Sequence, residues 1–294
     1  MRVADHLLRE TGRPVISFEF SRPTDDKAAS RLDKALGKLR ALNPDYVSVT
    51  FGAGGSTRDG SLELVDKLKN EFGFEVVAYI AGVGMGTDQL VEVLDKFRSL
   101  GIQTVFTIRG DAPTWDDTYE PHPQALAHAS DLIAFIKERY DFCLGTAGYP
   151  EGHKEAESKE RDIECLKLKV HNGAEYIVAQ YFYDNQYFFD FLDMCHAAQI
   201  NVPIVPGIMP VYTVKLMESL ARICGITITD EIHQGLAGLP PGDKKAVTDF
   251  GIRLAIRQCR GLLERGHNHL HFYTMNRANS VVSIIETLRG EGTL

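Results

Sequence analysis

The 294-residue sequence lacks the marks of several protein classes. Its cysteines are odd in number, five, and no pair has Cys-x-x-Cys spacing, so neither a disulfide framework nor a zinc site is indicated. Reduced and mostly buried thiols are expected instead. No apolar run is long enough to span a bilayer, and residues 1–14 lack the apolar core of a signal peptide. The expected location is therefore cytoplasmic.

The sequence also has fewer basic than acidic residues: 32 Lys and Arg against 40 Asp and Glu, which gives a formal net charge of -8. A surface of this sign repels phosphate backbones, which argues against general nucleic-acid binding. A local basic cluster can still hold a small anionic ligand. Hydrophobic residues make up 44% of the chain, enough for a substantial core, and the length is typical of one large barrel or two small domains.

Short β-type runs alternate with longer amphipathic stretches along the chain. Eight runs are predicted to be strands: 15–20, 46–51, 75–81, 104–108, 142–147, 176–183, 203–207 and 270–274. The alternation implies a parallel sheet, and the apolar character of the runs implies cover on both faces. Eight such units favour a closed (β/α)8 TIM barrel over an open doubly wound sheet, the alternative. The Gly-x-Gly-x-x-Gly fingerprint of that alternative does not follow the first strand.

About 45 residues separate the seventh and eighth predicted strands. They contain a short helical stretch at 229–236, a turn at 239–243 and a helix at 244–265. We interpret this segment as an extra helical insertion that extends the barrel. Because no linker, low-complexity tract or internal repeat is evident, residues 1–294 are expected to form a single barrel domain.

Barrels of this kind carry reactive groups at the C-terminal ends of the strands and in the loops that follow. Polar side chains are dense at these predicted positions. The candidates are Glu19, Thr50, Arg109, Asp111, Tyr149, His153, Gln180, Asp184, Tyr273, Asn276 and Arg277.

Two of these positions are the most informative. Side chains alternate along a strand, so Ser17 and Glu19 share the face that points into the barrel. A carboxylate there must be neutral, paired or hydrated, which suits a proton donor but also a structural carboxylate bonded to the next loop. The tripeptide Arg109-Gly110-Asp111 ends the fourth strand. It is either a simple ion pair or a site where Arg grips a phosphate while Asp faces a heterocycle.

The helix predicted at 155–172 carries further candidates. His153 would lie near its N-terminus, where anions bind readily. Asp162, Cys165 and Lys169 are spaced to share one helix face, which suits either an elongated polar ligand or a solvated surface.

No metal site is predicted. His267, His269 and His271 alternate at the entry to the last strand and can share one face. Acidic or soft ligands that would complete a coordination sphere are absent near them.

Seven motifs, in order, resemble those of bacterial 5,10-methylenetetrahydrofolate reductases of the short, single-barrel type. They are SFEF (17–20), YVSVTFGA (46–53), RGD (109–111), YPEGH (149–153), AQYFYD (179–184), PGIMP (206–210) and HFYTMNR (271–277). The similarity runs from about residue 15 to residue 286, nearly the whole chain. Each motif alone is modest, but seven at predicted strand ends form a strong signal.

The resemblance implies a barrel with FAD at its mouth, FMN being the alternative, and NADH or NADPH as co-substrate. Hydride would pass through the flavin to methylenetetrahydrofolate in a ping-pong reaction. Glu19 matches the acid that opens the folate ring, and Asp111 a carboxylate between flavin and pterin. Gln180, Tyr273 and Arg277, with Glu19, match substrate-binding positions. Flavin-contacting positions are matched by Thr50, Arg109, Gly110, Asp111, His128, Ala129, Tyr149, His153, Asp162, Cys165 and Lys169.

Several positions depart from the family pattern. Family members often carry His where Tyr79 stands, Tyr where His128 stands and Asn where Cys165 stands. An aromatic residue that commonly follows the Pro-Gly-Ile-x-Pro motif is replaced near Val214. The acid and the Arg-Gly-Asp segment survive, whereas parts of the flavin and folate walls have changed.

The resemblance leaves three functions to compare. The leading one is a self-sufficient FAD enzyme that oxidises NADH and forms a homo-oligomer, as these enzymes commonly do. The second is a catalytic subunit of a larger electron-transfer complex, reduced by a partner protein. The third is a folate-binding barrel without catalysis, which the costly retention of Glu19 and Asp111 argues against.

Overall fold

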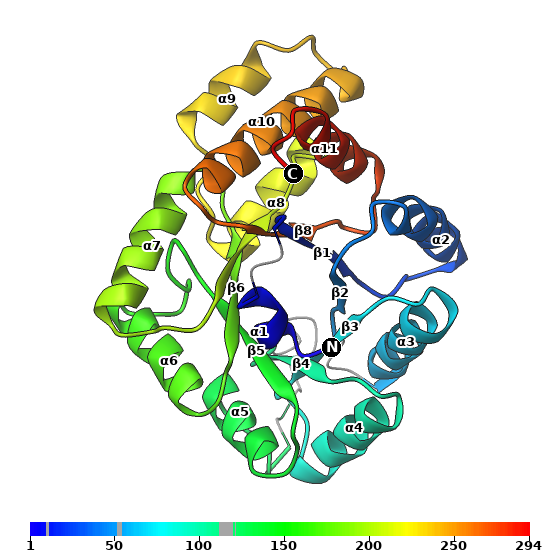
Figure 1. Ribbon diagram of the computed structural model, residues 1–294, viewed down its shortest axis with the longest axis vertical. Coiled ribbons are helices and arrows are strands. Elements are labelled where there is room, and N and C mark those ends of the chain that lie inside the picture. Colours follow the sequence, from blue (N-terminus) through cyan, green and yellow to red (C-terminus); the bar gives the residue numbers. More distant parts are fainter. Residues whose placement is uncertain (10–11, 52–54, 112–119, 121) are drawn as a thin grey trace.

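A computed structural model of the chain describes residues 1–9, 12–51, 55–111, 120 and 122–294. Eight parallel strands close into a barrel in chain order, each hydrogen-bonded to the next and β8 to β1 (Figure 1). The strands are β1 (Val15–Phe20), β2 (Tyr46–Val49), β3 (Val76–Ala81), β4 (Thr104–Ile108), β5 (Cys143–Gly148), β6 (Tyr176–Tyr181), β7 (Ile204–Ile208) and β8 (His269–Tyr273). The predicted barrel is confirmed, and the doubly wound alternative is wrong.

Helices surround the barrel and follow its strands. They are α2 (Asp26–Arg40), α3 (Gly55–Asp66) with a π-helical extension η1 (Lys67–Glu71), α4 (Thr87–Ser99), α5 (Ala129–Lys137), α6 (Lys159–His171), α7 (Asn185–Ala197), α8 (Val214–Cys224) and α11 (Asn279–Gly290). Within the described ranges, no helix has the length and apolar character needed to cross a membrane.

Strand alternation sends one set of side chains outward and the other inward. In β1, Ile16, Phe18 and Phe20 belong to the large core between the strands and the surrounding helices. Val15 belongs to a separate interior cluster that includes Tyr46, and Ser17 and Glu19 share its face of the strand. The predicted inward orientation of Glu19 is thereby confirmed.

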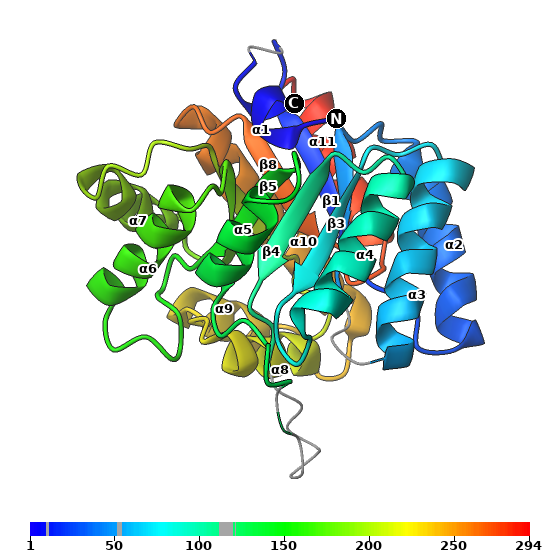
Figure 2. The same cartoon turned by 90° about the horizontal axis from the view of Figure 1, so that it is seen from below.

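A short N-terminal helix, α1 (Val3–Leu7), lies under the barrel and was not anticipated from the sequence. Val3, Ala4 and Leu7 are buried and pack with the interior cluster. The backbone amide of Val3 donates to Thr104 Oγ1 at 3.1 Å, which ties the helix to β4. Figure 2 shows α1 at the end of the molecule opposite α8 and α9.

The predicted insertion between β7 and β8 is present. It contains α9 (Asp230–Ala237) and α10 (Lys244–Glu264), which begin and end within a residue of the predicted helices. Thr229 and Asp243 cap them by accepting hydrogen bonds from the amides of Ile232 and Ala246. A third apolar cluster joins this insertion to α8 and to the end of β6.

The boundary of the helix after β5 differs from the prediction. The sequence pattern started this helix at 155, but α6 begins at Lys159 because Ser158 has an extended backbone and its hydroxyl caps the amide of Arg161. His153 therefore lies in the β5–α6 loop and not at a helix N-terminus. Its position is fixed instead by Asp162, whose carboxylate accepts from the His153 backbone amide at 3.2 Å.

Candidate active site

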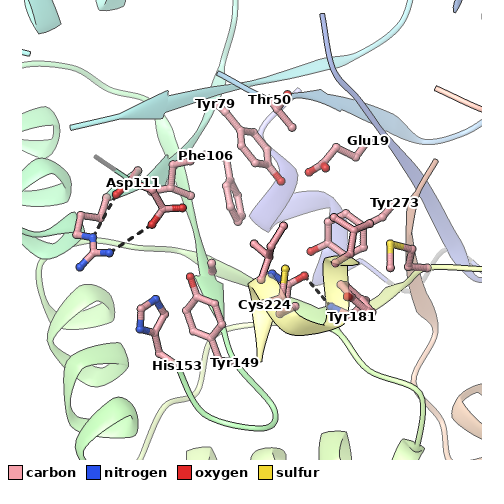
Figure 3. Close-up of a pocket in the computed structure, with 18 of the residues that line it drawn as sticks. Glu19, Thr50, Tyr79, Phe106, Asp111, Tyr149, His153, Tyr181, Cys224 and Tyr273 are labelled. Carbon is pink, nitrogen blue, oxygen red and sulfur yellow. Dashed lines mark hydrogen bonds and ion pairs between the residues drawn. The ribbon is translucent and has the colours of Figure 1, made fainter. Parts of the chain in front are cut away.

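A cavity of about 350 Å³ opens at the C-terminal mouth of the barrel. Such a volume lies in the range of small-molecule sites. Its lining comes from all eight strands or their following loops and from α8: Glu19, Thr50, Tyr79, Phe106, Ile108, Arg109, Gly110, Asp111, Ala147, Tyr149, His153, Lys154, Gln180, Tyr181, Met209, Leu220, Ile223, Cys224, Tyr273 and Met275. Ten of these residues are labelled in Figure 3.

Glu19 is the acidic group deepest in this cavity. Its side chain is 17% exposed, whereas that of Asp111 is 75% exposed. Below it, His271 Nε2 lies 4.0 Å from the Glu19 carboxylate, and this nitrogen has no hydrogen-bond partner in the described structure. The other ring nitrogen of His271 is hydrogen-bonded to Ser17 Oγ at 2.7 Å. Glu19 therefore stands between a buried imidazole and the open cavity.

Aromatic rings line the cavity wall around Glu19. Tyr79 stacks on Phe106 with 4.4 Å between ring centroids, and its hydroxyl points toward the Glu19 carboxyl in Figure 3. Burial, followed by the charge of Glu19, raises the pKa of Tyr79 well above its usual value, so this phenol stays protonated. Tyr273 has a raised pKa for the same two reasons, and its hydroxyl donates to the carbonyl of Ala179 at 3.1 Å. Glu19 is thus a carboxyl group with neutral phenol hydroxyls as neighbours.

Asp111 lies at the rim, where the Arg109 guanidinium contacts two carboxylates. Arg109 approaches Asp111 at 3.5 Å and Glu155 at 2.6 Å. Gly110 between them has φ +82°, and a Cβ there would come within 2.6 Å of a Val83 methyl group. Glycine is therefore required for the turn that directs Arg109 and Asp111 to the same rim. The ion-pair interpretation of this tripeptide is confirmed, and its ligand-binding interpretation remains a prediction.

A second cavity of about 460 Å³ shares Ile108, Arg109, Ala147, Tyr149 and His153 with the first. It extends between α5 and α6. Its other lining residues are Thr107, His128, Ala129, Ser130, Thr146, Glu155, Ala156, Arg161, Asp162, Cys165, Leu168 and Lys169. The two cavities therefore adjoin along these shared residues at the barrel mouth.

Lys169 carries the innermost cation of the second cavity. The side chain as a whole is partly exposed, but its ammonium group is enclosed and donates to the carbonyl of Ala147 at 2.6 Å. Burial lowers the pKa of Lys169 to about 8, with the nearby Asp162 carboxylate opposing the shift. Burial likewise raises the pKa of Asp162 and lowers that of His153.

The aromatic rings of Tyr149 and His153 meet edge to face at 4.6 Å between centroids, where the two cavities join. Lys169 Nζ lies 6.0 Å from the centre of the Tyr149 ring. Burial raises the pKa of Tyr149 to about 12, so its hydroxyl remains a neutral donor. The two cavities therefore meet at aromatic rings, with the Lys169 ammonium group behind them.

The structure gathers the predicted flavin-contacting residues along the joined cavities. Thr50, Gly110 and Asp111 line only the mouth cavity, His128, Ala129, Asp162, Cys165 and Lys169 line only the second, and Arg109, Tyr149 and His153 line both. Of the predicted substrate-binding residues, Glu19, Gln180 and Tyr273 line the mouth cavity. Arg277 does not. It lies beyond the β8–α11 turn, with its guanidinium 5.4 Å from the centre of the Tyr212 ring.

Two other candidates occupy structural positions. Asp184 caps α7 by accepting from the amide of Gln186 at 2.9 Å. Asn276 ties the end of β8 to the end of β1, because its side-chain amide donates to the Ser21 carbonyl at 2.8 Å and its amide oxygen accepts from the Ser21 amide. Both residues shape the mouth without lining the cavity.

The three alternating histidines do not form a common site. His267 packs edge to face on Phe188, His269 Nε2 contacts the carbonyl of Leu7 at 3.1 Å, and His271 is bonded to Ser17. Within the described residues, no group of three or more His, Cys, Asp or Glu side chains is arranged to hold a metal ion.

Sequence reasoning missed the apolar lining from α8. Leu220 and Ile223 face the mouth cavity, and Ile223 is 53% exposed. Val214, at the position where an aromatic residue is common, packs instead into the cluster beneath the insertion. The available signal was the three-residue spacing of Leu220 and Ile223, which places both on one face of a helix that follows a barrel strand.

The profile of the family described as methylenetetrahydrofolate reductase matches residues 3–289. The 5,10-methylenetetrahydrofolate reductase of Escherichia coli is 32% identical over 96% of this chain and 93% of its own length. Methylenetetrahydrofolate reductase (NADH) 1 of Arabidopsis thaliana is 34% identical over 98% of this chain. The chain spans about half the length of this plant relative, 51%.

Solved structures with low sequence identity show the same fold. An uncharacterised Clostridium thermocellum protein that binds two copies of 5-methyl-5,6,7,8-tetrahydrofolic acid has a TM-score of 0.67 and 16% identity, with 99% of each chain covered. Dihydropteroate synthase of Xanthomonas albilineans, in complex with 7,8-dihydropteroate, has a TM-score of 0.52 and 11% identity, with 96% of this chain and 94% of that one covered. The profile match across the chain and the near-full-length bacterial relative establish that the protein belongs to the methylenetetrahydrofolate reductase family.

Proposed function

We propose that the protein reduces 5,10-methylenetetrahydrofolate to 5-methyltetrahydrofolate, with FAD in the joined cavities and NADH or NADPH as the source of hydride. The observation that carries the proposal is the position of Glu19. Its carboxyl group is recessed in the mouth cavity, among aromatic side chains. The second cavity adjoins the mouth cavity and contains the buried ammonium group of Lys169. Family membership supports the reaction, and the NADH in the name of the Arabidopsis relative supports the donor.

The residues present fit a flavin dinucleotide in their chemistry. The two adjoining cavities have apolar and aromatic surface where they meet. Lys169, Arg109 and His153 would face the ribityl and phosphate portion, since positive charge is needed there despite the acidic surface. When bound, the flavin supplies two-electron chemistry, accepting hydride from the nicotinamide and giving it to the folate.

The chain's own residues would supply the proton and the charge stabilisation. Glu19 donates a proton to N10 of the folate as the bond between N10 and the bridging carbon breaks, which leaves an iminium cation at N5. The Asp111 carboxylate stabilises that cation. Hydride addition to the same carbon then completes the methyl group. The balance is one hydride and one proton for each folate reduced.

A visible spectrum of the purified protein under anaerobic conditions tests this proposal. We expect flavin absorbance that NADH bleaches and methylenetetrahydrofolate restores. A flavin that only a reduced partner protein bleaches would identify a subunit of an electron-transfer complex instead. A colourless protein that takes up no flavin and still reduces the folate with NADH would indicate direct hydride transfer and contradict the proposal.

A further inference from the structure

The phenol of Tyr79 faces the carboxyl group of Glu19 across the barrel interior. Tyr79 belongs to β3, two strands away from β1, yet its hydroxyl points toward Glu19 within the mouth cavity (Figure 3). Ser48, on the intervening β2, is in register with Glu19 and has a small side chain. Tyr79 can therefore reach across β2 to the carboxyl group.

Neighbouring rings hold Tyr79 in this orientation. Tyr79 and Phe106 are in register on β3 and β4, and their rings stack at 4.4 Å between centroids with 24° between the planes. The Phe106 ring lies in turn 6.1 Å from the ring of Tyr176, which is buried. Tyr79 itself is 7% exposed. A side chain ordered by such packing loses little further freedom when its hydroxyl donates a hydrogen bond.

Tyr79 is well placed to donate to the carboxylate, in contrast to the two other polar neighbours. His271 Nε2, at 4.0 Å, is beyond direct hydrogen-bond distance of Glu19. The Tyr273 hydroxyl donates to the carbonyl of Ala179 instead. Burial contributes most to the raised pKa of Tyr79, and the charge of Glu19 and a hydrogen bond with Glu19 also contribute. A phenol that stays protonated keeps a proton to donate.

We propose that Tyr79 is a positioning residue for the proton donor Glu19. Its hydroxyl would donate to the carboxylate that remains once Glu19 has given its proton to N10 of the folate, and it would hold that group facing the cavity. The proton leaves a Glu19 oxygen for N10, while the phenol keeps its own proton throughout. A donor fixed in advance toward a developing charge stabilises the charge without reorganising.

The proposal rests on the proposed function for the reaction in which Glu19 takes part. The contact between the phenol and the carboxyl group does not depend on turnover, so it can be tested separately. Tyr79→Phe is the variant for both tests, because it removes the hydroxyl and keeps the ring that stacks on Phe106.

Carbon-13 NMR of the purified protein, labelled at the glutamate side-chain carboxyl carbon, tests the contact without substrate. The resonance that is missing from Glu19→Gln belongs to Glu19. We expect this resonance to move by more than its line width in Tyr79→Phe, because the carboxyl oxygen loses its hydrogen-bond donor. A Glu19 resonance at the same position in Tyr79→Phe and in the wild-type protein would overturn the proposal.

Tyr181→Phe is the matched control. Tyr181 lines the same cavity from β6, and its hydroxyl lies beside the Cys224 thiol. The substitution removes one buried hydroxyl from the cavity wall, as Tyr79→Phe does, and should leave the Glu19 resonance in place. An equal movement of that resonance in Tyr181→Phe would assign the effect to general repacking of the wall and overturn the proposal.

Single-turnover kinetics of the holoprotein test whether Tyr79 acts through Glu19. Tyr79→Phe should slow flavin reoxidation by methylenetetrahydrofolate about tenfold, the loss expected for one hydrogen bond to a developing charge. Added to Glu19→Gln, the same substitution should slow the reaction by less than about twofold, since the group that it serves is already gone. A tenfold loss in both backgrounds would show that Tyr79 acts directly on the folate or the flavin, and would overturn the proposal.

The two tests separate this proposal from the proposed function. A wild-type protein that reduces no folate would contradict the proposed function, whereas the Glu19 resonance in Tyr79→Phe would still decide whether the phenol holds the carboxyl group. An unmoved resonance in a protein that does reduce the folate would leave the proposed function intact and overturn the role of Tyr79.

Discussion

Ser17 and His271 are joined by a 2.7 Å hydrogen bond inside the barrel, directly beneath Glu19. The two residues face each other across the pairing of β1 with β8, where Ser17 is in register with His271. The bond fixes the imidazole ring so that its second nitrogen faces the Glu19 carboxylate.

Replacing Ser17 with Ala should destabilise the protein and slow folate reduction. The buried imidazole nitrogen would lose its partner, at a cost of about 1–3 kcal/mol in the free energy of unfolding, measured by urea denaturation. A ring no longer held in place would also slow the folate half-reaction, whereas reduction by NADH should keep its rate. Ser30→Ala on the exposed face of α2 is the control and should change neither quantity. Unchanged unfolding in Ser17→Ala would show that the bond adds nothing to stability.

Glu19→Gln should separate the two half-reactions. The amide keeps the shape of the carboxyl group but cannot donate the proton, so folate reduction should fall by about 10²–10⁴-fold, the range for general acids. Reduction by NADH should be nearly intact in anaerobic stopped-flow measurements. Glu63→Gln, on the exposed side of α3, is the control. Folate turnover at the wild-type rate would exclude Glu19 as the acid.

Asp111→Asn should slow folate reduction by about tenfold, a smaller effect than that of Glu19→Gln. The carboxylate is 75% exposed, so solvent screens its interaction with a cationic iminium. The single-turnover rate of flavin reoxidation by methylenetetrahydrofolate measures the effect. A rate equal to that of the wild-type protein would remove the stabilising role assigned to Asp111.

Flavin affinity should depend on pH through Lys169. Burial lowers the pKa of its ammonium to about 8, so the free protein loses this cation as the pH rises through 8. A bound phosphate would raise that pKa again. Affinity should therefore be flat below pH 8 and fall above it, by up to about tenfold per pH unit. Titration of apoprotein with FAD at pH 6.5 to 9.5 measures this dependence.

Lys169→Met supplies the comparison for this titration. The variant keeps an unbranched side chain but has no charge to lose, so its affinity for FAD should be weaker at pH 7 and should not change on crossing pH 8. The same decline in affinity above pH 8 in both proteins would assign the titration to another group.

The sequence was sufficient to predict the barrel, because each strand is an apolar run and each helix has its own periodicity. The β4 boundaries matched residue for residue. The start of α6 was predicted four residues too early, at 155, because the helical pattern was extended past Ser158, the residue that caps the helix. The α1 helix was missed because five residues are too few to show a periodic pattern, and its burial depends on the barrel above it.

For the site, residues were predicted from their position at strand ends and from the family resemblance. Nearly all of these predicted residues line the two adjoining cavities. These two criteria could not place Arg277, because a turn of a few residues decides on which side of a wall a long side chain lies. Nor could they find Phe106, which is within β4 and enters the cavity through the barrel interior. Such contacts depend on strand tilt and register, which a linear pattern does not contain.

The α1 helix has a consequence for the order in which reactants can meet. Val3, Ala4 and Leu7 close the barrel at the end away from the mouth, so the deep part of the mouth cavity is a dead end. A molecule bound beside Glu19 must therefore leave through the mouth before another molecule can bind there. If the proposed function holds, the nicotinamide and the folate would occupy this chamber one after the other, and a flavin in the second cavity would hold the electrons in the interval.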